Sequence, residues 1–207
     1  MADPAAARRR RRRRRCCCCC PPLLLLLLLL TCLTGLEAAG PPGDGGGWSL
    51  ESELRLQDEG LCNVDVLDAS ALSHRQFLER YAFTRPVILR GLTDNTEYVD
   101  VWLRPQSSDV LGSGPGSGVP FHWHGPGFSE VIYGRKRWFL YPPHQEPHFH
   151  PNRTTLSWVT ETYPLLPEAE APLECTISPG EVLYFPDRWW HATLNLETSV
   201  FISTFLG

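Results

Sequence analysis

Hydrophobic and polar positions in the second half of the chain alternate over short runs that are separated by turn residues. Six such runs have the period of two that is typical of half-buried strands. The segments Pro142-Pro143 and Ser178-Pro179-Gly180 separate some of these runs, and proline and glycine in such segments favour turns. Several short strands at regular spacing indicate a β-sandwich or barrel. The predicted strands are residues 129–133, 137–141, 174–177, 181–185, 193–195 and 199–205.

The preceding residues have a different rhythm, which predicts a small α/β lead-in. Residues 64–67 read as a short strand. Ser73 then caps a helix that carries Phe77, Leu78 and Tyr81 at helical spacing. Residues 85–91 read as a strand closed by Gly91, and residues 156–163 as a short helix. The predicted divisions are 1–40, a targeting segment; 41–63, linker and lead-in; 64–93, the helix and strand; 94–118, an irregular connection; and 119–207, the core.

The first 40 residues have the composition of a secretory signal. Eight arginines at positions 8–15 precede five cysteines and a run of eight leucines, and small residues follow. This order favours a signal peptide over a nuclear-localisation patch, the alternative reading of the arginines. Uncleaved, residues 16–36 are long enough to anchor the chain in a membrane. We expect a protein of the endoplasmic reticulum lumen.

Charge is divided unevenly between the two parts of the chain. The whole sequence carries −4, but without residues 1–40 the net charge is −10. An acidic domain repels phosphate backbones, which disfavours nucleic acid as a partner. A protein substrate or protein partner is expected instead, and the domain is expected to be a monomer.

Two features depend on the lumenal location. Only Cys62 and Cys175 remain after the leader, and in an oxidising compartment they could form one disulfide. Two buried free thiols are the alternative, because spacing in sequence does not fix distance. Asn152 begins an Asn-Arg-Thr sequon in a polar stretch, which predicts a glycoprotein.

Three histidines carry the candidate chemistry. In a strand, His122 and His124 would point to the same face. Neutral imidazoles there could share one metal ion, and His191, which follows a predicted strand and turn, could supply a third ligand. The alternative for each is an ordinary surface or core histidine.

The spacing of these histidines resembles a known family. Gly116, His122 and His124 resemble the first motif of the cupin superfamily, and Gly180, Pro186, His191 and Asn195 resemble the second. Residues 134–143 and 188–196 resemble segments of one branch, the JmjC-domain hydroxylases. The resemblance implies an all-β double-stranded β-helix, the cupin/JmjC jelly roll.

The resemblance also implies roles for particular residues. JmjC hydroxylases bind Fe(II) through two histidines and a carboxylate, and His122 and His191 match the two histidines. Lys136, the only lysine in the sequence, matches the residue that pairs with the far carboxylate of 2-oxoglutarate. Asn195 matches a polar position near that cosubstrate. The alternative for Lys136 is a solvated strand lysine.

Two departures from the family bear on function. His124 stands at the carboxylate position, with Glu130 as a weak substitute six positions later. Only 31 positions separate Gly91 from His122, where the family has further strands, so we expect a shortened form, typical of alternative splicing, with an incomplete barrel. These departures favour a catalytically impaired regulatory or protein-interaction module. An Fe(II)/2-oxoglutarate-dependent protein hydroxylase is the alternative.

Overall fold

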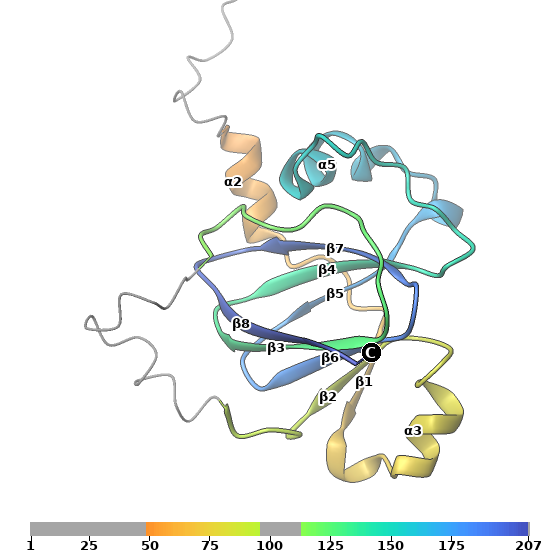
Figure 1. The fold of residues 1–207 in the computed structure, drawn as a ribbon. Coiled ribbons are helices and arrows are strands. Elements are labelled where there is room, and N and C mark those ends of the chain that lie inside the picture. The colour runs from red at the N-terminus through yellow and green to blue at the C-terminus, as the bar shows by residue number, and fades with distance from the viewer. Residues whose placement is uncertain (1–48, 96–112, 207) are drawn as a thin grey trace, which may run out of the picture. The chain divides into compact units, whose positions relative to one another are not determined.

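The computed structural model describes residues 49–95 and 113–206, drawn in colour in Figure 1. The predicted targeting segment, the first part of the linker and most of the predicted connection 94–118 lie outside the described residues. Within the described residues, no helix is long and apolar enough to cross a membrane.

Two β-sheets face each other and form the body of the domain (Figure 1). One sheet has five strands in the order β1-β2-β6-β3-β8, and the other has three in the order β5-β4-β7. Neighbouring strands are antiparallel except for β1 and β2, which are parallel. This arrangement confirms the predicted jelly-roll class. The strands are β1 Asp65–Asp68, β2 Val87–Arg90, β3 Gly127–Tyr133, β4 Lys136–Tyr141, β5 Leu173–Ile177, β6 Glu181–Phe185, β7 Trp190–Asn195 and β8 Val200–Phe205.

The main core lies between the two sheets. Because side chains alternate between the faces of a strand, Trp138 and Leu140 of β4 point inward, where they meet Ile88 and Leu183 from the facing sheet. The remaining buried members of this cluster are Val64, Val131, Cys175, Ile177, Phe185 and Trp189. Burial of this apolar surface is the main force that holds the sheets together.

Helices cover the outer faces of the sheets. The outer side of the three-stranded sheet packs against α5 (Thr155–Glu161), where Phe139 meets Trp158, and Leu56 of α2 (Leu50–Gln57) joins the same cluster. On the outer face of the five-stranded sheet, Phe77 of α3 (His74–Arg80) contacts Tyr184 edge to face, with 4.9 Å between ring centroids. Short 3-10 helices are Ala69–Ala71, Tyr163–Leu165 and Glu168–Glu170.

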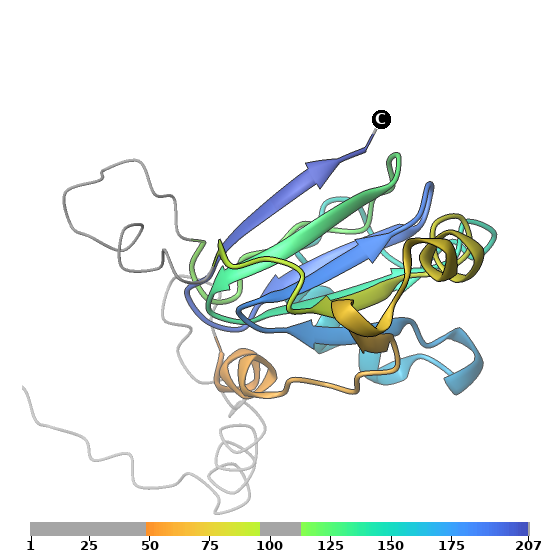
Figure 2. The same cartoon turned by 90° about the horizontal axis from the view of Figure 1, so that it is seen from below.

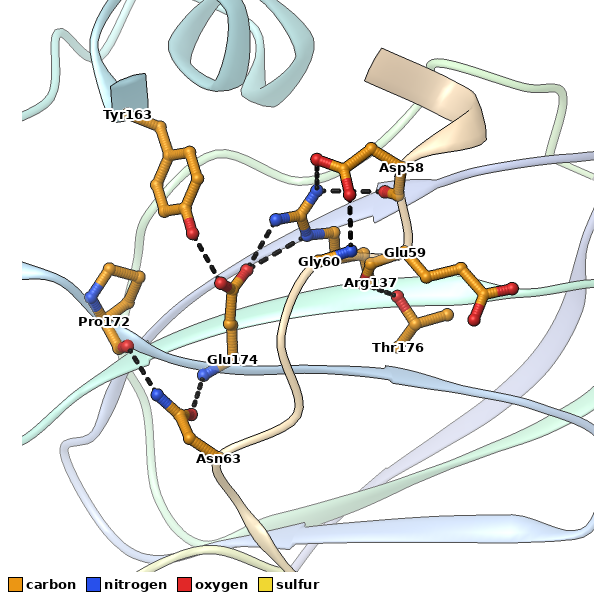
Figure 3. A network of polar contacts seen from close by, with 9 residues as sticks. All are labelled: Asp58, Glu59, Gly60, Asn63, Arg137, Tyr163, Pro172, Glu174 and Thr176. Carbon is orange, nitrogen blue, oxygen red and sulfur yellow. Dashed lines mark hydrogen bonds and ion pairs between the residues drawn. The ribbon is translucent and has the colours of Figure 1, made fainter. Parts of the chain in front are cut away.

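A buried polar network fastens the lead-in to the three-stranded sheet (Figure 3). Arg137 and Glu174 form an ion pair with 2.7 Å between Nη2 and Oε2, and both side chains are at most 2% exposed. The Arg137 Nη1 also donates to the carbonyl oxygen of Asp58. Asn63 completes the network by exchanging hydrogen bonds with the Glu174 backbone. Residues 58–63 are therefore held against the edge of β5.

The outer edge of β7 is covered by residues 117–122, an irregular extended segment. The backbone N–H of Asn195 donates to Ser117, and that of Thr193 donates to Val119. At the end of this segment, His122 and His191 exchange two backbone hydrogen bonds of 3.1 and 2.9 Å. This pairing brings the two predicted metal motifs together.

Strand β8 lies at one edge of the five-stranded sheet (Figure 2). Within the described residues it pairs as a strand only with β3. A single bridge joins Ser113 to Ser199, the residue before β8 begins.

The predicted elements agree with the structure in their order and type, with two corrections. The lead-in contains an unpredicted helix, α2, whose N-cap is Ser49. The expectation that His122 and His124 lie in a strand is wrong. His122 makes only an isolated bridge, and Gly125-Pro126 end any extension of it.

Candidate metal centre and ligand pocket

The three predicted histidines converge, although they come from different kinds of backbone. His191 lies within β7, which begins three residues earlier than predicted, and His122 is held opposite it by the backbone bridge. His124 follows in irregular chain, where its carbonyl oxygen accepts a 2.9 Å hydrogen bond from the N–H of Arg188. One ligand nitrogen from each imidazole lies within 4.8 Å of the other two.

Hydrogen bonds fix which nitrogen of each ring faces the others. The three Nδ1 atoms lie 2.8–2.9 Å from the carbonyl oxygens of Pro120, Gly125 and Trp189. A carbonyl oxygen only accepts, so each Nδ1 carries the hydrogen and each Nε2 presents a lone pair. Such backbone contacts are the usual means by which proteins orient metal-binding histidines.

The Nε2 atoms of His124 and His191 are only 3.1 Å apart. Two lone pairs at this distance repel each other unless a proton or a cation lies between them. Among the described residues, these three histidines are the one group of potential ligands that gathers in this way. The donor set fits a borderline divalent metal such as Fe, Zn, Co or Ni, which imidazole nitrogen suits.

Burial favours the neutral form of His122 and His191, which is the form that binds metal. Burial lowers the pKa of His191 to about 3, with a further contribution from repulsion by His122. Burial also lowers the pKa of His122. Aromatic rings pack against two of the histidines: Phe185 lies 4.6 Å from the His191 ring, and Phe205 lies 4.4 Å from the ring of His124, as measured between ring centroids.

Lys136 lies on the inner face of β4, at the other end of the same cavity. The cavity has a volume of about 200 Å³ and is bounded by the three histidines as well as by Lys136. The Lys136 side chain is buried rather than solvated, and the residue is only 2% exposed. Burial lowers the pKa of its ammonium to about 8. Within the described residues, no carboxylate pairs with this ammonium.

The neighbours of Lys136 are one amide and two aromatic rings. Its Nζ donates to Asn195 Oδ1 at 3.2 Å, and the Asn195 Nδ2 donates to Ser117. Nζ also lies 3.5 Å from the ring centroid of Phe201 and 6.0 Å from that of Trp138. The Nε1 of Trp138 is buried without an acceptor in the described part of the chain. The ammonium of Lys136 therefore borders a cavity that offers it few acceptors, which suits an acceptor-bearing ligand.

Glu130 does not join the histidines, so its predicted substitute role is wrong. It points to the opposite face of β3, because alternation sends Ser129 and Val131 inward. Its two carboxylate oxygens accept hydrogen bonds from Thr93 and Asn95.

The remaining predicted residues, Cys62, Cys175 and Asn152, do not line this cavity. The sulfur atoms of Cys62 and Cys175 are 2.01 Å apart, as in a disulfide, which joins the lead-in to β5. Asn152 is exposed in the loop before α5. Sequence reasoning missed Phe201 and Trp138 as pocket residues, because an aromatic residue in a strand normally signals core packing.

Comparison with known proteins places this fold and site in a family. The model of the cupin-like domain matches residues 114–205. JmjC domain-containing protein 8 of Homo sapiens is 43% identical over 257 residues, which cover 84% of this chain and 97% of that protein. The chain belongs to the cupin-like JmjC-domain family.

Other JmjC proteins are also similar to this chain. JmjC domain-containing protein 8 of Rattus norvegicus is 42% identical over 248 residues, covering 81% of this chain and 91% of the relative. A protein of Gallus gallus named 2-oxoglutarate and iron-dependent oxygenase JMJD4 is 31% identical over 140 residues. The alignment covers 62% of this chain and 33% of that protein. The alignment with the human JmjC protein is longer than this chain of 207 residues. That relative therefore has residues without a counterpart in this chain.

Proposed function

We propose that this chain is a lumenal JmjC-domain module. In this proposal it binds a divalent metal ion at its three histidines and 2-oxoglutarate at Lys136, but has impaired turnover and acts through a protein partner. The observation that carries the proposal is the position of His124. Its Nε2 faces that of His191 at 3.1 Å, where JmjC oxygenases have a carboxylate.

The charge of the ligand set gives the physical reason for impaired catalysis. Non-haem Fe(II) oxygenases hold iron by two neutral imidazoles and one carboxylate, which leaves open positions for cosubstrate and oxygen. When bound, Fe(II) with 2-oxoglutarate supplies oxygen activation. Three neutral imidazoles make the site one unit more positive. Glu130 is held by other partners, so it does not restore the missing charge.

This chain's own residues would perform the binding steps. His122, His124 and His191 present preoriented lone pairs to the metal. Lys136 offers an ammonium to the far carboxylate of 2-oxoglutarate, a charge-assisted contact. Asn195 positions that ammonium through its Oδ1.

The alternative is an active protein hydroxylase of the Fe(II)/2-oxoglutarate type. The buried ammonium of Lys136 favours it, because burying a charge without a counterion costs free energy that a cosubstrate carboxylate would offset. A relative named as a 2-oxoglutarate and iron-dependent oxygenase points in the same direction.

Two measurements on protein produced from the full chain in secretory cells separate these functions. Succinate formation from 2-oxoglutarate with Fe(II) is measured for wild type, His191→Ala and His124→Asp. We expect wild type to match His191→Ala, and His124→Asp, which restores the carboxylate, to gain turnover. Turnover by wild type that His191→Ala abolishes would establish the hydroxylase instead.

Metal and partner binding provide the second comparison. Co(II) absorption spectra should show a bound ion in wild type and none in His191→Ala. Protein partners captured from the lumen should be the same for both proteins if the module acts without turnover. Loss of the partners in His191→Ala would show that partner binding requires the metal centre and would contradict a partner surface that is independent of it.

A further inference from the structure

The Phe201 ring occupies space next to Lys136 that a bound carboxylate would need. Its centroid lies 3.5 Å from Nζ, within the range of a cation–π contact. A carboxylate oxygen paired with an ammonium would sit about 2.8 Å from the same nitrogen. One of the three N–H groups of the ammonium already donates to Asn195 Oδ1.

Phe201 belongs to β8, which is an edge strand among the described residues. It lies opposite Val131 in the β3–β8 pairing, and it packs at the margin of the main core rather than within it. Beyond it, the inward-facing Phe205 is 61% exposed, so the cavity opens along β8. Within the described residues, β8 has a strand partner on one side alone. A ring on such an edge strand can leave the ammonium without disrupting the sandwich.

We propose that Phe201 is a gate over Lys136 that determines how tightly the pocket holds a carboxylate ligand. The ring stabilises the buried ammonium while the pocket lacks such a ligand. A dicarboxylate such as 2-oxoglutarate binds when its far carboxylate displaces the ring from Nζ. The inference rests on the proposed function, because it assumes that Lys136 receives the cosubstrate.

The gate adds a second cause of weak cosubstrate use, separate from His124. A ligand must give up the favourable contact between Lys136 and the ring before it forms its own ion pair. Cation–π contacts of desolvated ammonium groups are strong enough to weaken binding by roughly tenfold.

Calorimetric titration of the full-chain protein with 2-oxoglutarate tests the gate, after Mn(II) uptake has been measured separately. The variants are Phe201→Ala, Phe201→Leu and Lys136→Met. Ile202→Ala is the matched control, because Ile202 is the next residue of β8, faces the other side of the sheet and is 41% exposed.

The gate predicts a specific order of affinities. Phe201→Ala should bind 2-oxoglutarate roughly tenfold more tightly than wild type. Phe201→Leu, which keeps bulk but has no aromatic face, should lie between the two. Ile202→Ala should match wild type, and combining Lys136→Met with Phe201→Ala should remove the gain. The probe 2-oxobutyrate, which lacks the far carboxylate, should bind equally to wild type and Phe201→Ala.

Each other outcome has a defined meaning. Equal affinity of wild type and both Phe201 variants would overturn the gate and leave the proposed function standing. Mn(II) uptake without 2-oxoglutarate binding in any variant would overturn the gate and the cosubstrate role of Lys136 together. If no variant takes up Mn(II), the metal centre fails. The same titration on metal-free protein still decides the gate, because the Lys136 contact requires no metal. If Phe201→Ala does not unfold cooperatively, Phe201→Leu decides the direction of the effect.

Discussion

Arg137 and Glu174 form an ion pair on the outer face of the three-stranded sheet, where their side chains are 1% and 2% exposed. Glu174 also accepts a hydrogen bond from the hydroxyl of Tyr163, and Arg137 donates to Asp58 (Figure 3). This pair therefore joins β4, β5, the lead-in and the segment after α5. Its partners satisfy both charges, which is the condition under which a buried ion pair is tolerated.

Removing one charge of this pair should destabilise the domain strongly. Glu174→Gln leaves the Arg137 guanidinium buried without its main counterion, and we expect a loss of about 3–5 kcal/mol of unfolding free energy. Urea denaturation measures it. Arg137→Met combined with Glu174→Leu should lose less than either single change. Arg153→Met is the control, because the exposed Arg153–Glu161 pair should contribute less than about 1 kcal/mol. Equal losses from the buried and exposed pairs would contradict this account.

The link between Cys62 and Cys175 should contribute substantially to stability. It joins residues 113 positions apart, and closing a loop of this length restricts the unfolded chain by about 4–5 kcal/mol in the chain-entropy model. Dithiothreitol should therefore lower the urea midpoint of wild type. The double variant Cys62→Ser with Cys175→Ala should have the lower midpoint with or without reductant. If dithiothreitol leaves the urea midpoint of wild type unchanged, the two thiols are unpaired in solution.

Lys136 should make stability rise with pH in the alkaline range. Its pKa is about 8 in the folded state, because of burial, against an ordinary value of 10.5. Between these values the unfolded chain binds more protons, so unfolding free energy increases with pH, by at most about 1.4 kcal/mol per pH unit. Below pH 8 the folded state bears the full cost of the buried ammonium.

Lys136→Met provides the comparison for that prediction. The variant should lack the rise between pH 8 and 10.5, and it should be more stable than wild type at pH 7. Urea denaturation at each pH gives the free energy of unfolding of both proteins. The difference between the two values isolates Lys136, because tyrosine titration contributes equally to both proteins. Parallel stability curves for the two proteins would show that the ammonium is not desolvated.

Asn152 should carry a glycan if the chain enters the secretory pathway. It is exposed in a loop, and Thr154 of the sequon caps α5 through its hydroxyl, so the test changes Asn152 rather than Thr154. Protein from secretory cells should shift on a gel after treatment with an N-glycosidase. Asn152→Gln should remove the shift. An unshifted wild-type protein would contradict the lumenal assignment or the use of this sequon.

Period and spacing in the sequence indicated a β-sandwich or barrel and most of its elements, whereas the jelly roll itself was implied by the family resemblance. The alternation at 181–185 and the capping signal at Ser73 gave the right elements because both are local properties of the chain. Helix α2 was missed because its short sequence adjoins a glycine-rich stretch. Leu56 is buried only through contact with the outer face of the distant three-stranded sheet.

The three candidate metal ligands lie together, but not for the reason that the sequence suggested. The same-face argument for His122 and His124 assumed a strand, which the structure does not contain. The rings converge because His122 bridges to His191 and because each Nδ1 finds a carbonyl oxygen. Spacing of the motifs singled out three histidines that do gather in the structure, whereas their geometry depended on contacts across the sheets.

The sequence, through its motifs and the family they resemble, determined the candidate residues: the single lysine and three histidines, one of which stands where the family has a carboxylate. Only the tertiary structure decided that Lys136 is buried, that Phe201 covers it, and that Glu130 faces away. These facts depend on β4 and β8 meeting in one interior although about 60 residues separate them. Burial and pairing at such separations are set by how the sheets pack, which no local pattern encodes.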